Sequence, residues 1–197
     1  MIKTFHNATY TQESHWYQWD QLRHDQITPN LYHLLMDRGS LTDCVKRNCR
    51  HGFNLKVHSQ DFGRPTHSEQ QLLKLPRAAP VIVREIALNC SHIPWIFART
   101  LIPPASMHGK GHGLASLGNK SLGTVLFAHR KVQRHRVEIT YLKPHHHLFQ
   151  RAIQATNCIA PSTGLWARRT LFLLADKPLL VNEIFLPNIV HHNAICK

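Results

Sequence analysis

Apolar and polar residues alternate with a period of two in six separate stretches of the chain. This period places successive side chains on opposite faces of an extended segment and therefore predicts β-strands. The six stretches cover residues 53–57, 80–90, 95–102, 137–141, 165–174 and 178–186. Only a short join at Asp176 and Lys177 separates the last two, so we expect them to pair as an antiparallel hairpin.

Helix-like patterns lie before and between these strands. Leucines within residues 31–35 indicate a short helix that Gly39 ends, and Ser40 then caps a second helix. A third short helix is expected at residues 122–128. This order favours an α+β fold, with an antiparallel sheet of about six strands and helices packed around it. The whole chain, residues 1–197, is expected to form a single domain.

Two of the predicted strands carry a charge on the face that the alternation makes apolar. Arg84 shares its face with isoleucine and leucine, and Glu183 shares its face with valine, leucine and phenylalanine. A buried ionised group destabilises a fold unless it is paired or bound to a ligand. The sequence leaves two interpretations: the two residues form a ligand site, or they form an ion pair with each other.

Two other charged positions on strands carry less weight. Arg99 shares a face with large apolar residues, and a long arginine can cover such a surface while its guanidinium stays in water. Glu138 shares its face with Arg136 and Thr140, and we expect it on the solvent side.

The chain is strongly basic. It has 24 Lys and Arg against 11 Asp and Glu, a net charge of +13 with neutral histidines. This balance suits a nucleic acid, an anionic surface or a small anionic substrate. The densest basic segment, residues 130–136, has no aromatic side chain to stack on a base. It is interpreted either as a solvated face or as a patch that attracts anions.

The sequence also bears on location. No apolar run reaches the roughly 18–20 residues of a membrane span, and residues 1–10 lack the apolar core of a secretory signal. The five cysteines are scattered and are interpreted as cytosolic thiols. We therefore expect a cytoplasmic protein without stable membrane insertion.

Three local motifs suggest other chemistry, and each departs from the pattern that the chemistry needs. Residues 113–121 are close to a phosphate-binding P-loop, but Asn119 separates the second glycine from the lysine. His145–His147 are adjacent, so they do not converge on one metal ion as histidines four apart on a helix would. Cys90 lies near His92 at a strand end and is interpreted as structural. No metal site is expected.

Several segments resemble the chorismate pyruvate-lyase (chorismate lyase) family. The resemblance follows a consistent order from about residue 31 to residue 187, which leaves residues 1–30 as an N-terminal extension. The segments that carry it are DRGSLT (37–42), VREIAL (83–88), PWIFART (94–100), LGNKSLG (117–123), GLWARR (164–169) and KPLLVNEIFLP (177–187).

This resemblance implies an enzyme that eliminates pyruvate from chorismate to give 4-hydroxybenzoate for ubiquinone biosynthesis. By motif, the family's arginine for the ring carboxylate falls on Arg84, and its glutamate for the ring hydroxyl falls on Glu183. These two are the implied catalytic residues. Main-chain contacts to the substrate would fall at Leu41 and Leu122. The expected protein is a monomer that uses no cofactor and binds no nucleic acid.

The implied chemistry suits these residue types. A buried arginine can hold one of the two chorismate carboxylates through paired hydrogen bonds. Loss of the enolpyruvyl group makes the ring aromatic, so the enzyme acts mainly by positioning the substrate and excluding water. Glu183 would orient the 4-hydroxyl or assist proton movement. Arg84 and Glu183 are then expected to face a common cavity about one aromatic ring apart.

The alternative is a binding module without chemistry. The ligand-sensing domains of some bacterial repressors resemble the same fold and could bind an aromatic effector. Such repressors carry a winged-helix DNA-binding domain ahead of the sensor, and residues 1–30 are too short for one, which favours the enzyme. A third hypothesis, a nucleic-acid-binding protein, rests on net charge alone.

Overall fold

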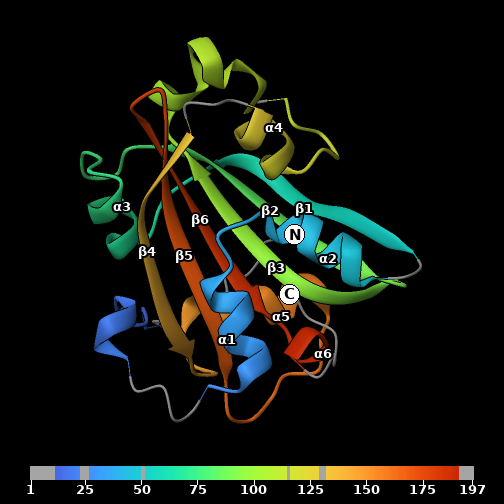
Figure 1. Cartoon of the computed structure of the whole chain (residues 1–197). Coiled ribbons are helices and arrows are strands. Elements are labelled where there is room, and N and C mark those ends of the chain that lie inside the picture. The colour runs from blue at the N-terminus through green and yellow to red at the C-terminus, as the bar shows by residue number, and fades with distance from the viewer. Residues whose placement is uncertain (1–11, 23–26, 50–51, 115, 129–131, 191–197) are drawn as a thin grey trace, which may run out of the picture.

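One antiparallel sheet of six strands organises the chain (Figure 1). The structure is a computed structural model and describes residues 12–22, 27–49, 52–114, 116–128 and 132–190. Its strand order is β1-β2-β3-β6-β5-β4, which confirms the predicted fold class. The strands are β1 (Phe53–Gly63), β2 (Val81–Cys90), β3 (Ile93–Ile102), β4 (Val132–Leu142), β5 (Leu165–Leu174) and β6 (Lys177–Phe185).

Two tight hairpins form the centre of the sheet. Ser91 and His92 turn β2 into β3, and Ala175 and Asp176 turn β5 into β6, with positive φ at all four residues. Two-residue turns of this kind match the right-handed twist of the paired strands. Pairing of β3 with β6 joins the hairpins and sets their register, in which Ala98 lies opposite Glu183.

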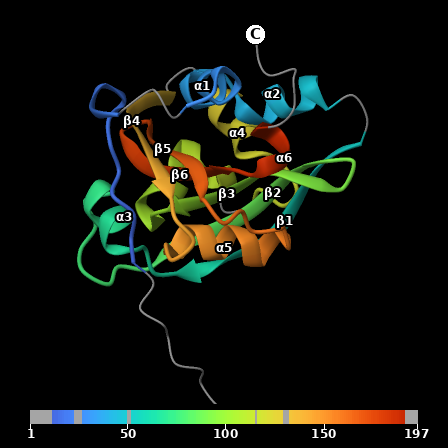
Figure 2. The ribbon, with the colours of Figure 1, turned by 90° about the horizontal axis from the view of Figure 1, so that it is seen from below.

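Helices cover both faces of the sheet, as the view from below shows (Figure 2). The helices α1 (Pro29–Met36), α2 (Leu41–Asn48), α4 (Leu122–Ala128) and α6 (Pro187–Val190) pack on one face. The helices α5 (His147–Thr156) and α3 (His67–Leu72) pack on the other. Because both faces are covered, the interior strands β2 and β5 are buried along almost their whole length.

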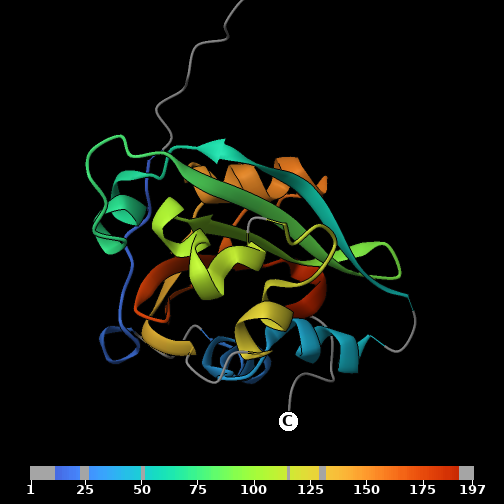
Figure 3. The ribbon, with the colours of Figure 1, turned by 90° about the horizontal axis from the view of Figure 1, so that it is seen from above.

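Three short 3₁₀ helices complete the described elements: η1 (Trp19–Gln21), η3 (Pro104–Met107) and η4 (Gly109–Leu114). Figure 3, the view from above, shows η3 and η4 over one end of the sheet, next to α4. Leu114 and Leu117 pack there with Leu122 and Leu126. The glycine-rich segment Gly109–Leu114 is therefore wound into helical turns and packed against the core.

The helix predictions were partly right. α1, α2 and α4 form where the sequence placed them, and the Ser40 hydroxyl accepts a hydrogen bond from the Asp43 amide at 3.2 Å, as an N-cap does. α3 and α5 were missed. α3 starts at a capping box in which Thr66 and Glu69 each bind the other's backbone amide, a signal that the sequence analysis did not use.

The N-terminal segment from Gln12 packs against the sheet and α5. Tyr17 exchanges backbone hydrogen bonds with Ile139 of β4, and Gln12 accepts one from the amide of His147. The Glu13 carboxylate accepts hydrogen bonds from the amides of His67 and Ser68 at the start of α3. Residues 12–22 are thus attached to β4, α5 and α3 through both main chain and side chains.

One expectation about the cysteines was wrong. Cys49 at the end of α2 and Cys90 at the end of β2 form a disulfide bond, so they are not scattered thiols. Cys44 is also disulfide-bonded, and Cys158 is free. Disulfides persist mainly in oxidising environments, so this bond does not support the cytosolic interpretation. None of the described helices is long and apolar enough to cross a membrane.

Candidate active site

A small cavity lies between the sheet and the first turns of α2 and α4. Its volume is about 60 Å³. The floor comes from β2, β3, β5 and β6, and most of its walls are apolar. The lining residues are Gly39, Ser40, Leu41, Thr42, Ile86, Leu88, Ile96, Ala98, Thr100, Leu122, Gly123, Leu126, Arg134, Phe172, Val181 and Glu183.

Arg84 lies on the sheet face that forms this floor. Its neighbours Ile86 on β2 and Thr100 on β3 line the cavity, although Arg84 itself is not a lining residue. The side chain is 1% exposed, and Nη2 donates to the carbonyl oxygens of Gly118 and Lys120 at 3.0 Å. Nε and Nη1 are buried without a hydrogen-bond partner in the described structure. Desolvation by burial lowers the pKa of Arg84, the expected effect on a buried cation.

Glu183 lines the cavity from β6 and is partly open to it. Its side chain is 14% exposed, and Oε2 accepts a hydrogen bond from Nε of Arg168 at 2.7 Å. Arg168 also donates to the carbonyl oxygens of Leu34, Leu35 and Asp37, which are the unpaired acceptors at the end of α1. Glu183 is therefore held in place by a buried arginine that is itself fixed by a helix end.

Arg84 and Glu183 do not form an ion pair with each other. Among the described ion pairs, the partner of Glu183 is Arg168, and Arg84 contacts only carbonyl oxygens. The two residues share one face of the sheet, two strands apart and two positions offset. Ordinary strand spacing puts their Cα atoms about 12 Å apart, and both side chains project from the same face of the sheet.

Leu41 and Leu122 occupy equivalent places at the top of the cavity. Each is the first residue of a helix, α2 or α4, and each lines the cavity while being buried. The backbone amides of a first helical turn have no acceptor within their own helix. Both leucines thus lie where main-chain groups are able to meet a ligand.

Arg134 is a charged residue of this cavity that the sequence analysis did not single out. It lines the cavity from β4, and its guanidinium donates to the carbonyl oxygens of Asp37 and Gly39 at 3.0 and 2.6 Å. The sequence pointed to the basic segment 130–136 as a patch that could attract anions. It did not indicate which residue of this segment faces the cavity. A register shift between Arg134 and Arg136 breaks the alternation of β4 at this point.

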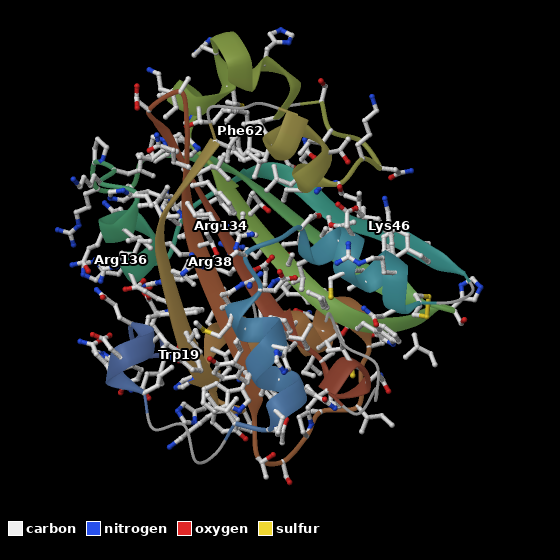
Figure 4. All side chains as sticks on the ribbon, viewed as in Figure 1. Trp19, Arg38, Lys46, Phe62, Arg134 and Arg136 are labelled. Atoms are coloured by element: carbon white, nitrogen blue, oxygen red, sulfur yellow. A yellow bond between two sulfur atoms is a disulfide. The ribbon has the colours of Figure 1, made fainter. Side chains whose placement is uncertain are left out.

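A second and larger cavity lies on the other side of Arg134. It measures about 320 Å³ and is bounded by α1, η1 and β4. Arg38, Arg134 and Arg168 all border it, together with Asp37. Figure 4 shows the labelled side chains of Arg38 and Arg134 next to each other in front of the sheet.

The opposite face of the sheet holds a buried network of ion pairs, which corrects two expectations. Glu138 is 3% exposed and accepts a hydrogen bond from Arg169 at 2.5 Å, so it does not lie on the solvent side. The Arg99 guanidinium does not reach water. It pairs with Glu69 at 3.2 Å and with Glu85 at 2.9 Å, under α3 and α5. Alternation failed to separate the two faces because helices bury both.

The P-loop-like segment and the adjacent histidines make contacts within the fold. The carbonyl oxygens of Gly118 and Lys120, in the segment that approaches a P-loop, bind Arg84. His146 caps the start of α5, and its Nδ1 accepts a hydrogen bond from the Lys143 amide at 3.0 Å. Burial lowers the pKa of His146 and of His147. Within the described residues, no group of three or more His, Cys, Asp and Glu is arranged to hold a metal ion.

The fold and the cavity together define an α+β protein with a small, largely apolar site between an antiparallel sheet and two helix starts. Solved structures share this fold at low sequence identity. PhnF from Mycobacterium smegmatis aligns with a TM-score of 0.58 and 15% identity over 82% of this chain and 70% of that chain. The ligand-binding domain of a putative GntR-family transcriptional regulator from Bordetella bronchiseptica aligns with a TM-score of 0.51 and 13% identity over 75% and 91%.

Sequence comparison defines the family. The model of the family described as chorismate lyase matches residues 10–195. The probable chorismate pyruvate-lyase of Nitrosomonas eutropha is 39% identical over 160 residues, which cover 81% of this chain and 88% of that protein. The probable chorismate pyruvate-lyase of Methylococcus capsulatus is 37% identical over 156 residues, covering 79% and 94%. The chain belongs to the chorismate lyase family, which confirms the resemblance found in its segments.

Proposed function

We propose that this protein eliminates pyruvate from chorismate to give 4-hydroxybenzoate, and that the reaction takes place in the cavity under α2 and α4. The observation that carries the proposal is a buried, partly unsatisfied cation on the same sheet face as a carboxylate that lines the cavity. Arg84 has two buried nitrogens with no partner among the described residues, and Glu183 lines the cavity on the same sheet face. A ligand with a carboxylate at one end and a hydroxyl at the other complements both.

Arg84 is the proposed site of the ring carboxylate. A buried guanidinium with unused donors binds a carboxylate strongly, because charge-assisted hydrogen bonds gain strength where water is excluded. The two carbonyl contacts of Nη2 fix the plane of the guanidinium before the ligand arrives. The ligand then supplies the negative charge that the described surroundings of Arg84 lack.

Glu183 is proposed to accept a hydrogen bond from the hydroxyl at ring carbon 4. Its Oε2 is already bound by Arg168, and a carboxylate has further lone pairs for a second donor. This contact would fix the ring relative to Arg84. In the elimination, the bond from carbon 3 to the enolpyruvyl oxygen breaks, carbon 4 loses its hydrogen as a proton, and the electron pair left behind completes the aromatic ring. The leaving enolpyruvate takes up a proton and becomes pyruvate.

The apolar walls would contribute by holding the ring and excluding water. Ile86, Leu88, Ile96, Ala98 and Val181 supply this surface from the sheet. With about 60 Å³, the cavity has room for about four waters. Entry of the substrate therefore requires the segments around Leu41 and Leu122 to move outward. Their backbone groups are the proposed main-chain contacts to the bound ligand.

The decisive experiment mixes purified protein with chorismate in the presence of a chelator and measures 4-hydroxybenzoate and pyruvate by chromatography. We expect both products in equal amounts without added metal. Glu183→Gln should lower kcat/KM by at least about 100-fold, as loss of a group acting at the reacting centre does. The matched control is Asp61→Asn, which neutralises an exposed carboxylate on β1. Equal activity of both variants would contradict the role of Glu183.

The second candidate is a sensor that binds an aromatic ligand without chemistry, and the fold shared with a GntR-family ligand-binding domain favours considering it. Titration calorimetry with 4-hydroxybenzoate, combined with the chorismate assay, separates the two functions. Binding with no turnover of chorismate would support the sensor and reject the enzyme.

We further propose that residues 1–197 form one lyase domain that acts as a monomer in the cytoplasm. The family match over residues 10–195 and the packing of Gln12 to Leu22 on β4 and α5 support the single domain. Light scattering after size-exclusion chromatography tests the monomer. The Cys49–Cys90 disulfide makes the location testable, because alkylation of both thiols in freshly lysed cells would support the cytoplasm.

A further inference from the structure

Arg134 is a cation in the cavity wall whose charge is not matched by a carboxylate. It is the one positively charged lining residue of the small cavity within the described part of the chain. Its Nη1 and Nη2 bind the carbonyl oxygens of Asp37 and Gly39. Its Nε is buried and has no hydrogen-bond partner among the described residues. The guanidinium therefore keeps unused donors after its protein contacts are counted.

The charges around the cavity favour a ligand with two negative groups. Arg168 and Glu183 neutralise each other as an ion pair. Arg84 and Arg134 remain, and none of the described ion pairs includes either residue. Arg84 is buried and Arg134 is partly buried. Unpaired cations in such places lower stability without a ligand, and a dianion would compensate both.

We propose that Arg134 binds the second carboxylate of the substrate, the one on the enolpyruvyl group, while Arg84 binds the carboxylate on the ring. This inference rests on the proposed function, because it takes chorismate as the ligand. Arg134 is then a substrate-binding residue that recognises the leaving group.

The positions of Arg84 and Arg134 match the positions of the two carboxylates in chorismate. In chorismate the enolpyruvyl ether is on ring carbon 3, next to the carbon that carries the hydroxyl. The second carboxylate must therefore lie near the residue that binds the hydroxyl, which is Glu183. Glu183 and Arg134 line the same small cavity, and Arg168 and Arg134 border the larger one. Arg84 lies two strands away from Glu183, on the far side of β3.

Neighbouring cations are weaker candidates for this role. Arg168 has its Nε on Glu183 and its Nη1 on three carbonyl oxygens, and it does not line the small cavity. Arg38 borders only the larger cavity of the two. Arg134 borders both, so it forms part of the wall between them.

The same contacts connect the leaving group to the α1–α2 connection. Arg134 holds the carbonyl oxygens of Asp37 and Gly39, directly before Ser40 and Leu41. A carboxylate on the remaining donors would fix the guanidinium and with it the segment that borders the cavity. Release of pyruvate would remove this restraint, while 4-hydroxybenzoate would stay bound through Arg84 and Glu183.

The test compares two ligands that differ by one carboxymethoxy group. They are 4-hydroxybenzoate and 3-(carboxymethoxy)-4-hydroxybenzoate, whose extra carboxylate is attached through an ether beside the hydroxyl. Titration calorimetry should show that the wild-type protein binds the diacid at least about 10-fold more tightly than the monoacid. In Arg134→Gln the two ligands should bind with about equal affinity, while the affinity for 4-hydroxybenzoate changes less than about 3-fold, because that ligand has no second carboxylate to lose a partner. Arg134→Lys should keep part of the preference.

Arg136→Gln is the matched control, since Arg136 is a half-exposed arginine on the same strand. It should keep the wild-type preference for the diacid. Equal loss of both ligands in Arg134→Gln would overturn the proposal and assign Arg134 to holding the α1–α2 connection. An unchanged preference would overturn it as well.

Turnover separates this inference from the function on which it rests. With chorismate, Arg134→Gln should raise KM and lower kcat/KM while the 4-hydroxybenzoate affinity stays near the wild-type value. If the wild-type protein does not convert chorismate, the proposed function fails. The comparison of the two ligands still reports whether Arg134 binds a second carboxylate.

Discussion

Four arginines are buried in the described part of the chain, and their partners differ between the two faces of the sheet. Arg99 and Arg169 lie under α3 and α5 and are paired with carboxylates. On the cavity face Arg168 pairs with Glu183, whereas Arg84 has only two carbonyl acceptors. A buried cation without an anion lowers stability, so its presence is best explained by binding.

Replacement of Arg84 tests this explanation at the residue scale. Arg84→Met should weaken binding of 4-hydroxybenzoate by about 2–5 kcal/mol, because the carboxylate loses its buried charge partner. The free energy of unfolding should stay equal or rise, since methionine removes an unpaired buried charge at similar volume. Calorimetric titration and urea unfolding measure the two quantities. Unchanged affinity would contradict the assignment, and Arg84→Lys should give an intermediate loss.

At the scale of elements, the segment from α1 to α2 is fixed at three points. Arg168 on β5 and Arg134 on β4 hold the carbonyl oxygens between the two helices. The Cys49–Cys90 disulfide attaches the end of α2 to the end of β2. Ser40 caps the start of α2, and Leu41 borders the cavity. The helix that covers the site is thus positioned by contacts with three different strands.

The disulfide should contribute to stability by restricting the unfolded chain. Its two cysteines are 41 residues apart, and for such a loop the chain-entropy model gives about 4 kcal/mol. We expect the double variant Cys49→Ser, Cys90→Ser to lose free energy of unfolding of this order in urea titrations. Cys158→Ser is the control, because Cys158 is free and only partly buried. Equal stability of the double variant and the control would show that the bond does not constrain the fold.

At the scale of the whole molecule, one sheet separates a binding face from a structural face. The structural face carries a network in which Glu85 receives hydrogen bonds from Arg99 and Arg151. Asn182 and Arg99 both donate to Glu69. These bonds satisfy buried charges between the sheet and the helices α3 and α5, so the network links strands that are far apart in the chain.

This network makes stability depend on pH. Burial raises the pKa of Glu85, but the hydrogen bonds and charges of Arg151 and Arg99 outweigh burial and leave the pKa below the usual value of a glutamate. The unfolded chain therefore takes up its proton first, and the contribution of Glu85 to stability is lost as the pH falls below about 4.5 towards its folded pKa. Urea midpoints measured from pH 6 to pH 3 should fall less steeply for Glu85→Gln than for wild type. Parallel profiles would contradict this role.

Much of the fold could be predicted because its signals are local. Alternation placed all six strands, and the turn at Asp176 and Lys177 predicted the antiparallel hairpin that the structure contains. β1 and β4 are longer than expected, because each contains a register shift that breaks the alternation. α5 was missed because it lies in the histidine-rich segment, where neither the apolar spacing nor the cap at His146 was used.

The site was only partly predictable. Arg84 and Glu183 stood out because each is a single charge in an otherwise apolar alternation. By the same rule Glu138 was placed in solvent, although it is buried in an ion pair with Arg169. Arg134 had no such signal, since it is one of several basic residues in segment 130–136. Whether a charge is paired depends on elements that only the folded chain brings together.

The sequence by itself determined the six strands, the α+β class and the two charges on the cavity face, because periodicity and charge are properties of neighbouring residues. Its segments also indicated the family to which the chain belongs. Only the tertiary structure decided that Glu183 pairs with Arg168 rather than Arg84, and that Arg134 turns into the cavity. The reason is that strand pairing and helix packing join residues far apart in the chain, and these contacts fix which charges are neutralised and which remain for a ligand.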